Sequence, residues 1–152
     1  MYTKQEASAI RQQFWTTLGQ YLSPIPSATG SKVNWINYKT GIKNIHFKMD
    51  ADKDGAIIRI EIRGEEAKIE LIYNLFVSLQ KQFNSFFTNE FTWQKETFDE
   101  HNKPLGCIYH VSENLNVFKK EDWPDLISFF KNNITSLDAF WAEHKEIFEM
   151  NI

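Results

Sequence analysis

Apolar residues recur every three or four positions near the start of the chain, the spacing of one helix face. Thr3 and Glu6 precede this pattern and form a T-x-x-E capping box. The sequence therefore predicts a helix over about residues 3–22. Its apolar positions are Ala7, Ile10, Phe14, Leu18, Tyr21 and Leu22. The following "SPIPSATGS" predicts an irregular connection, because proline cannot continue a helix and serine and glycine favour loops.

Between Val33 and Arg63 the pattern changes to strict alternation, which is typical of strands with one buried face. Three strands are predicted here, over "VNWINYK" (33–39), "NIHFKMD" (44–50) and "AIIRIEIR" (56–63). Short turns between them favour an antiparallel meander. The residues expected to face the core are Ile45, Phe47 and Met49 on the second strand and Ile58, Ile60 and Ile62 on the third.

The next segment, "EEAKIELIYNLFVSLQKQFNSFF" (65–87), returns to helical spacing and predicts a second amphipathic helix. A second hairpin is predicted from "FTWQKETF" (91–98) and "LGCIYHV" (105–111). Its second strand should place four residues on one face. These are Leu105, Cys107, Tyr109 and Val111.

The last segment carries the most regular apolar pattern, beginning at Asp122 with Pro124 in the first turn. It predicts one long helix or two abutting helices broken near Asn132 and Asn133, and the spacing fits both. Its stripe contains Trp123, Ile127, Phe130, Ile134, Leu137, Trp141, His144 and Phe148. Because this aromatic load exceeds what one sheet face readily covers, a homodimer is an open alternative.

These elements predict a single α+β domain over residues 1–152, since one hydrophobic core commonly reaches this size. The expected order is α-β-β-β-α-β-β-α. A mainly antiparallel sheet of about five strands should pack against three amphipathic helices and leave its other face comparatively open. With 42% hydrophobic residues the core needs no cofactor for folding.

Composition and charge indicate where the protein is located and what charge its partner carries, but they do not indicate a reaction. No apolar run approaches the roughly 18 residues of a membrane span, and the opening residues lack the pattern of a secretory signal. A cytoplasmic location is therefore expected. The single cysteine, Cys107, cannot form an internal disulfide. The net charge is −3, yet residues 7–49 contain no acid and five basic residues. Such asymmetry indicates either a surface for an anionic partner or an accident of sequence in a short chain.

Residues Asp50, Asp52, Asp54 and Glu61 follow the spacing of a twelve-residue calcium loop. That loop requires helical flanks, whereas both flanks here alternate like strands. An extended chain would place Glu61 about 23 Å beyond Asp54, at roughly 3.3 Å per residue. We therefore favour a hairpin turn, with Gly55 supplying a positive φ, over a calcium site.

A metal-dependent enzyme is the other alternative for these acids. Asp50 with Glu61-Ile62-Arg63 resembles the acidic residues and E-x-K of a metal-dependent nuclease. Arg63 stands where lysine should be, and arginine is too basic to accept a proton. A solvated strand face explains the same residues more simply, so no catalytic residue is assigned.

The stretch "SKVNWINYKTGIKNIHFK" (31–48) interleaves four lysines with aromatic residues and contains no acid. On an exposed sheet face, such side chains stack bases and neutralise phosphates. The alternative is that its aromatic residues point into the core and its lysines only solvate a strand. The candidate ligand-binding residues are Trp35, Tyr38, Lys39, Lys43, His46, Lys48 and Arg59. A protein or a nucleic acid would be the partner.

Three strings, "FWTTLGQY", "WINYKTGIK" and "FKKEDWP", resemble a bacterial family known as domain of unknown function 4268. The likeness covers nearly the whole chain. Members of that family occur alone and as a C-terminal part of longer proteins with nuclease-like domains. The resemblance implies an accessory or recognition role in a nucleic-acid or defence context, and it transfers no catalytic residues. We therefore expect a non-enzymatic recognition module, with the metal-dependent enzyme as the alternative.

Overall fold

The computed structural model describes residues 2–152, and the elements within them confirm the α+β class. In chain order they are α1 (Lys4–Leu22), β1 (Ile45–Ala51), β2 (Gly55–Ile62), α2 (Glu66–Ser78), α3 (Gln80–Asn84), β3 (Thr92–Phe98), β4 (Pro104–Glu113), the 3₁₀ turn η1 (Lys120–Asp122) and α4 (Trp123–Asn151). Over residues 2–152 the sheet has four antiparallel strands in the order β1-β2-β4-β3. The edge strands are therefore β1 and β3.

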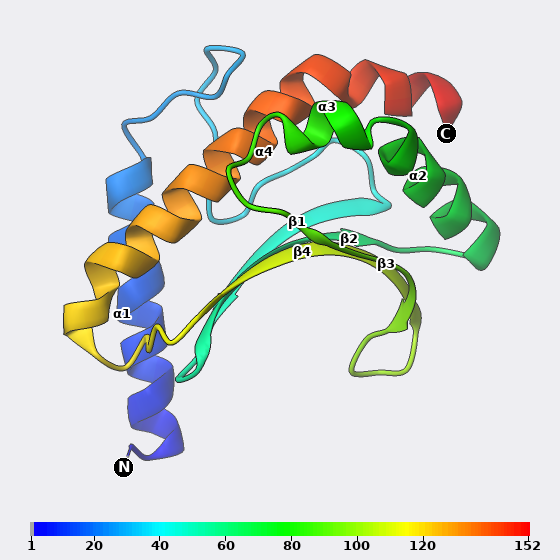
Figure 1. The fold of residues 1–152 in the computed structure, drawn as a ribbon. Helices are drawn as coiled ribbons and strands as arrows, with labels where there is room; N and C mark the ends of the chain where they lie inside the picture. Colours follow the sequence, from blue (N-terminus) through cyan, green and yellow to red (C-terminus); the bar gives the residue numbers. More distant parts are fainter. Residues whose placement is uncertain (1) are drawn as a thin grey trace.

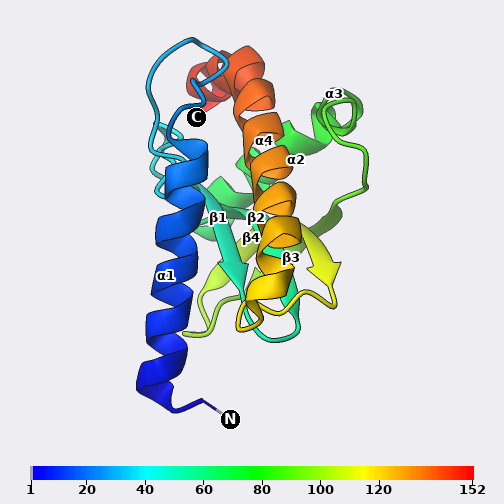
Figure 2. The ribbon, with the colours of Figure 1, turned by 90° about the vertical axis from the view of Figure 1, so that its left-hand side faces the viewer.

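The sheet forms an arch with its helices gathered on the convex side (Figure 1). Helices α2, α3 and α4 lie above this side, and α1 stands beside one end of the arch, next to β1 (Figures 1 and 2). Within residues 2–152 no helix covers the concave side (Figure 1), which agrees with the expected open face. None of the helices in this part of the chain has the length and apolar character that a membrane crossing needs.

The predicted β1–β2 hairpin is confirmed, and the residues expected to face the core do so. Phe47 pairs with Ile60 and Met49 with Ile58, and their side chains belong to the core or pack against it. Ile58 and Ile60 are fully buried, and burying each contributes about 1.5–3 kcal/mol to folding. Polar residues of the same strands face the concave side, as the alternation predicts.

The prediction of a strand at 33–39 is wrong, and the sheet has one strand fewer than expected over residues 2–152. This segment is irregular, with Asn34 accepting a hydrogen bond from the backbone of Asn37 in a local turn. Trp35 is buried and donates from Nε1 to the carbonyl of Ile25 at 3.0 Å. Contacts with loop and helix residues therefore replace the pairing with β1 that the alternation indicated.

The single helix predicted over 65–87 is also wrong, because the chain bends at Leu79 (φ −105°, ψ 12°) into α2 and α3. The bend accompanies the burial of Phe83, whose ring lies 5.1 Å from Phe140 and 5.4 Å from Trp93. Core packing here overrides the helical periodicity. The last helix, by contrast, is continuous through Asn132 and Asn133.

The aromatic residues of α4 are largely buried within the chain itself. Phe130, Phe140 and Phe148 are fully buried, and Phe76 of α2 lies 4.6 Å from Phe148. The argument for a homodimer that rested on uncovered aromatic residues therefore loses its basis.

Candidate functional site

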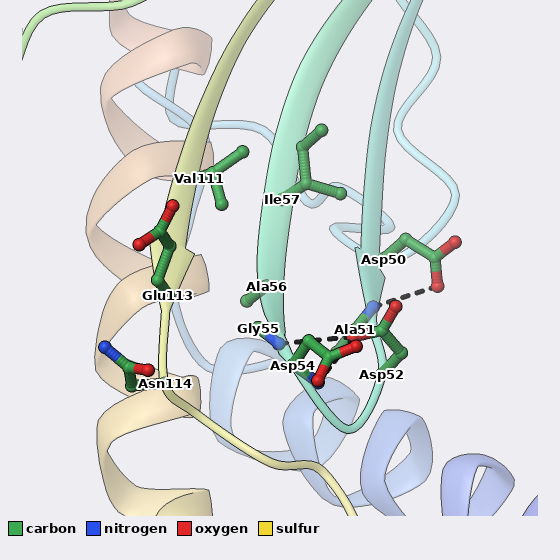
Figure 3. Close-up of a pocket in the computed structure, with 10 residues that line it drawn as sticks. All are labelled: Asp50, Ala51, Asp52, Asp54, Gly55, Ala56, Ile57, Val111, Glu113 and Asn114. Atoms are coloured by element: carbon green, nitrogen blue, oxygen red, sulfur yellow. Dashed lines mark hydrogen bonds between the residues drawn. The ribbon is translucent and has the colours of Figure 1, made fainter.

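The acidic residues of the β1–β2 turn line a shallow pocket of about 460 Å³ at one end of the sheet (Figure 3). Asp50 accepts a hydrogen bond from the backbone of Ala51 at 2.9 Å. Asp52 accepts from the backbone of Asp54 at 2.8 Å and of Gly55 at 3.2 Å. These bonds fix the turn, so the aspartates serve local backbone structure as a hairpin requires.

The structure does not bring Glu61 to these aspartates. The register places Glu61 opposite His46, while Asp50 lies opposite Ile57 near the other end of the hairpin. Among residues 2–152 there is no group of three or more His, Cys, Asp or Glu side chains that could hold a metal ion. The calcium and nuclease arrangements therefore have no assembled ligand set here.

Gly55 itself is explained by crowding and not by the positive φ that we expected. Positive φ occurs at Gly30, Gly41 and Gly64 but not at Gly55. A Cβ atom on Gly55 would lie 2.6 Å from the carbonyl oxygen of Ser112. Glycine is needed because β4 passes close to the backbone at this point.

Glu61 instead belongs to an ion-pair network on the concave side of the sheet. It is only 4% exposed and accepts from Arg59 Nε at 2.6 Å and from Arg63 Nε and Nη2 at 3.1 and 3.0 Å. Arg63 also donates from Nη1 to Asp99 at 2.7 Å. The network thus ties β2 to the loop between β3 and β4.

The two carboxyl groups of this network stay ionised. Burial raises the pKa of Glu61, but hydrogen bonds from Arg59 and Arg63 outweigh burial, so the net pKa is lowered. The backbone N–H of Lys103 and the guanidinium of Arg63 lower the pKa of Asp99 to about 2. The alternating R-x-E-x-R of residues 59–63 was a sequence signal for this network that we did not predict.

Cys107 lies beside the network, opposite Glu61 in the register. Burial raises the pKa of its thiol to about 11. The thiol is therefore protonated at neutral pH and behaves as a small apolar side chain, because the thiolate is the nucleophilic form.

A second hollow, of about 430 Å³, runs along β1 and is the surface that we call the basic groove. It contains four of the predicted ligand-binding residues. Its lining is Trp15, Ile36, Asn37, Tyr38, Lys39, His46, Phe47, Lys48 and Met49. No acid is among them. Lys39 and Lys48 are exposed, and neither forms an ion pair within residues 2–152.

The other three candidates lie outside the basic groove. Trp35 is a core residue at 3% exposure. Lys43 is exposed in the turn before β1. Arg59 lies directly opposite Lys48 on the concave side, where Glu61 binds its guanidinium.

Tyr38 is held in the groove wall by a buried acid on α4. Its hydroxyl donates to Asp138 at 2.6 Å, and burial, followed by this hydrogen bond, raises the pKa of Tyr38. Asp138 also accepts from the backbone of Ala28 at 2.7 Å and from the hydroxyl of Ser27 at 3.0 Å. One carboxylate thereby holds two parts of the 23–44 loop, which forms one wall of the groove.

Trp15 and Asp138 were not predicted from the sequence. Trp15 stands next to the core residue Phe14, and its ring packs on Phe130 at 5.2 Å while also lining the groove. Its signal was an aromatic residue one position off the apolar stripe. Asp138 is an acid on the buried face of the last helix, a placement that requires partners.

Comparisons with known proteins give one positive finding. The family model described as "Domain of unknown function (DUF4268)" matches residues 10–145 of the chain. A search of curated proteins found no match, and neither did a search of solved structures. The matched region covers most of the chain and includes the resembling strings noted above. The chain belongs to the family of domain of unknown function 4268.

Proposed function

We propose that this chain is a non-enzymatic recognition module, which binds an anionic segment of another macromolecule in the basic groove. The observation that carries the proposal is the acid-free lining with two lysines that have no ion pair among residues 2–152. Exposed lysines without a counter-charge attract anionic groups. An anionic partner would therefore supply the negative charges that Lys39 and Lys48 do not contact within residues 2–152.

The rest of the described chain favours binding over catalysis. Asp50 and Asp52 of the turn accept backbone hydrogen bonds, and the Asp54 carboxylate pairs with Lys53. The Cys107 thiol is buried and protonated. The family resemblance adds a setting to the proposal, namely a bacterial accessory role in a nucleic-acid or defence context.

The test measures binding of two labelled anionic probes by fluorescence anisotropy. One probe is a polyglutamate peptide and the other is single-stranded oligothymidylate, each at about 50 and about 200 mM salt. The groove variant is Lys39→Glu with Lys48→Glu. Its control is Lys103→Glu with Lys131→Glu, which changes the net charge equally at exposed positions elsewhere.

We expect at least one probe to bind the natural chain and the control, and to bind the groove variant about tenfold or more weakly. Binding should also weaken at the higher salt concentration. Equal affinity of the groove variant and the control, or no binding of either probe at low salt, would refute the proposed function.

A further inference from the structure

The free edge of β1 exposes backbone groups that β2 does not use. At the two ends of the hairpin, Asp52 donates to Gly55 and Arg63 donates to Asn44. Residues of an antiparallel strand face their neighbour alternately, so even-numbered positions of β1 face β2. The odd-numbered positions from Ile45 to Ala51 point their backbone N–H and C=O groups outward.

Groups at both ends of this outward row already have partners. Ile45 donates to Ile42 at 3.1 Å and accepts from the Thr40 hydroxyl at 2.7 Å. The N–H of Ala51 donates to the Asp50 carboxylate. Between them, within residues 2–152, no hydrogen bond satisfies the backbone groups of Phe47 or Met49. These residues line the basic groove.

The two edges of the sheet differ in regularity. The β1–β2 register runs without a shift from Ile45 to Ala51, whereas the register of β3 shifts between Gln94 and Thr97. Bulges blunt an edge against further pairing, and a regular edge is a template for another strand. The open template is therefore β1.

The groove also offers different side chains on its two sides. Phe47 and Met49 face the helices. Helix α1 lies beside β1 (Figure 2), and its Trp15 also lines the groove. His46 and Lys48 face the concave side. Because neighbouring residues of a strand alternate between faces, the groove fits a segment that alternates apolar and acidic residues.

Resting on the proposed function, we propose that the partner is an extended acidic segment of another protein, which pairs with β1 at Phe47–Met49 as an additional strand. Backbone hydrogen bonds supply affinity in this mode, and alternate side chains supply specificity. A second copy of this chain fits poorly, because pairing two β1 edges would bring together the two Lys48 side chains.

A nucleic acid has less to bind in this groove. Single strands bind by stacking bases on aromatic rings. The Tyr38 ring is already stacked on Phe47 at 5.1 Å, and Trp35 is buried. The unpaired backbone groups of β1, in turn, match the backbone of a peptide.

The experiment uses a labelled peptide of about nine residues with alternating glutamate and valine. Two further versions carry N-methyl groups on every second residue, one set on the glutamates and one on the valines. In an added strand, N–H groups of one set point at β1 and those of the other set point away. Met49→Pro is the matching protein variant, because proline removes an outward N–H and is tolerated at edges.

We expect the parent peptide to bind, one N-methylated version to bind about tenfold more weakly, and Met49→Pro to weaken binding similarly, since each change removes backbone hydrogen bonds. Circular dichroism checks that Met49→Pro folds; if it does not, the N-methylated peptides on the natural chain decide. Equal binding of all three peptides overturns the inference. Binding of oligothymidylate by a chain that does not bind the peptide overturns it as well. The proposed function survives both results. Equal peptide binding by the Lys39→Glu/Lys48→Glu variant refutes the proposed function itself.

Discussion

Replacing Glu61 by glutamine tests the ion-pair network on the concave side. The substitution keeps the size of the side chain and removes its charge. Glu61 accepts three N–H groups from two arginines, and a glutamine has one oxygen to accept them, while its own N–H₂ group faces the arginines. At least one donor then lacks a partner, and the remaining hydrogen bonds lose their charge.

The expected cost follows from the exposure of the partners. Removing one member of a fully buried pair costs about 3–5 kcal/mol, and exposed pairs contribute about 0–1 kcal/mol. The side chains of Arg59 and Arg63 are 27% and 34% exposed, so water partly replaces the lost acceptor. We therefore expect Glu61→Gln to lower the free energy of unfolding by about 2 kcal/mol at pH 7.

Urea denaturation followed by circular dichroism measures this change. Glu96→Gln, at an exposed residue of β3 that has no ion pair within residues 2–152, is the matched control and should change stability by less than about 0.5 kcal/mol. If Glu61→Gln behaves like this control, the network does not stabilise the fold and our reasoning is refuted.

The same pair has a defined pH dependence. The pKa of Glu61 is lowered in the folded chain from 4.5, so its contribution is present above that value and is lost as the pH falls below it. The difference in unfolding free energy between the natural chain and Glu61→Gln should therefore shrink as the pH falls from 6 toward about 3. A difference that grows with acidity would contradict the assigned cause.

Two further predictions concern the turn and the groove wall. Asp52→Ala removes the acceptor for two backbone N–H groups and should cost about 0.5–2 kcal/mol by analogy with a lost helix cap, while added calcium should leave the melting temperature of both proteins unchanged. Asp138→Asn should cost about 1–3 kcal/mol and speed hydrogen exchange at the Ala28 amide, measured by nuclear magnetic resonance. Unchanged exchange at Ala28 would show that Asp138 does not hold the loop.

The sequence predicted the hairpin well because its information is local. One buried face fixes the register of two alternating strands, since a slip by one residue would expose Ile58 and Ile60. The aspartates and Gly55 mark the turn between them. The α4 helix was predicted for the same reason, although its apolar spacing did not exclude a break near Asn132.

The conformation of the loop that forms the groove wall could not be predicted, because its contacts are with residues far away in the sequence. Tyr38 bonds Asp138 one hundred residues later, and the carbonyl of Thr40 accepts from Trp141 at 2.8 Å. The alternation at 33–39 indicates that Trp35 is buried and that its neighbours are more exposed. The alternation does not indicate whether a strand or a helix covers the buried side chain.

The absence of a strand at 33–39 leaves the edge of β1 unpaired, and this edge is the one proposed to bind a partner. Had residues 33–39 paired with β1, as their alternation indicated, they would have used the backbone groups of Phe47 and Met49. Asp138 and Trp141 hold that segment from α4 instead, and Thr40 reaches only the Ile45 end of β1. The segment therefore stands beside the edge and contributes Tyr38 and Lys39 to a wall. A partner strand bound there would give the sheet the fifth strand that this chain does not supply within residues 2–152.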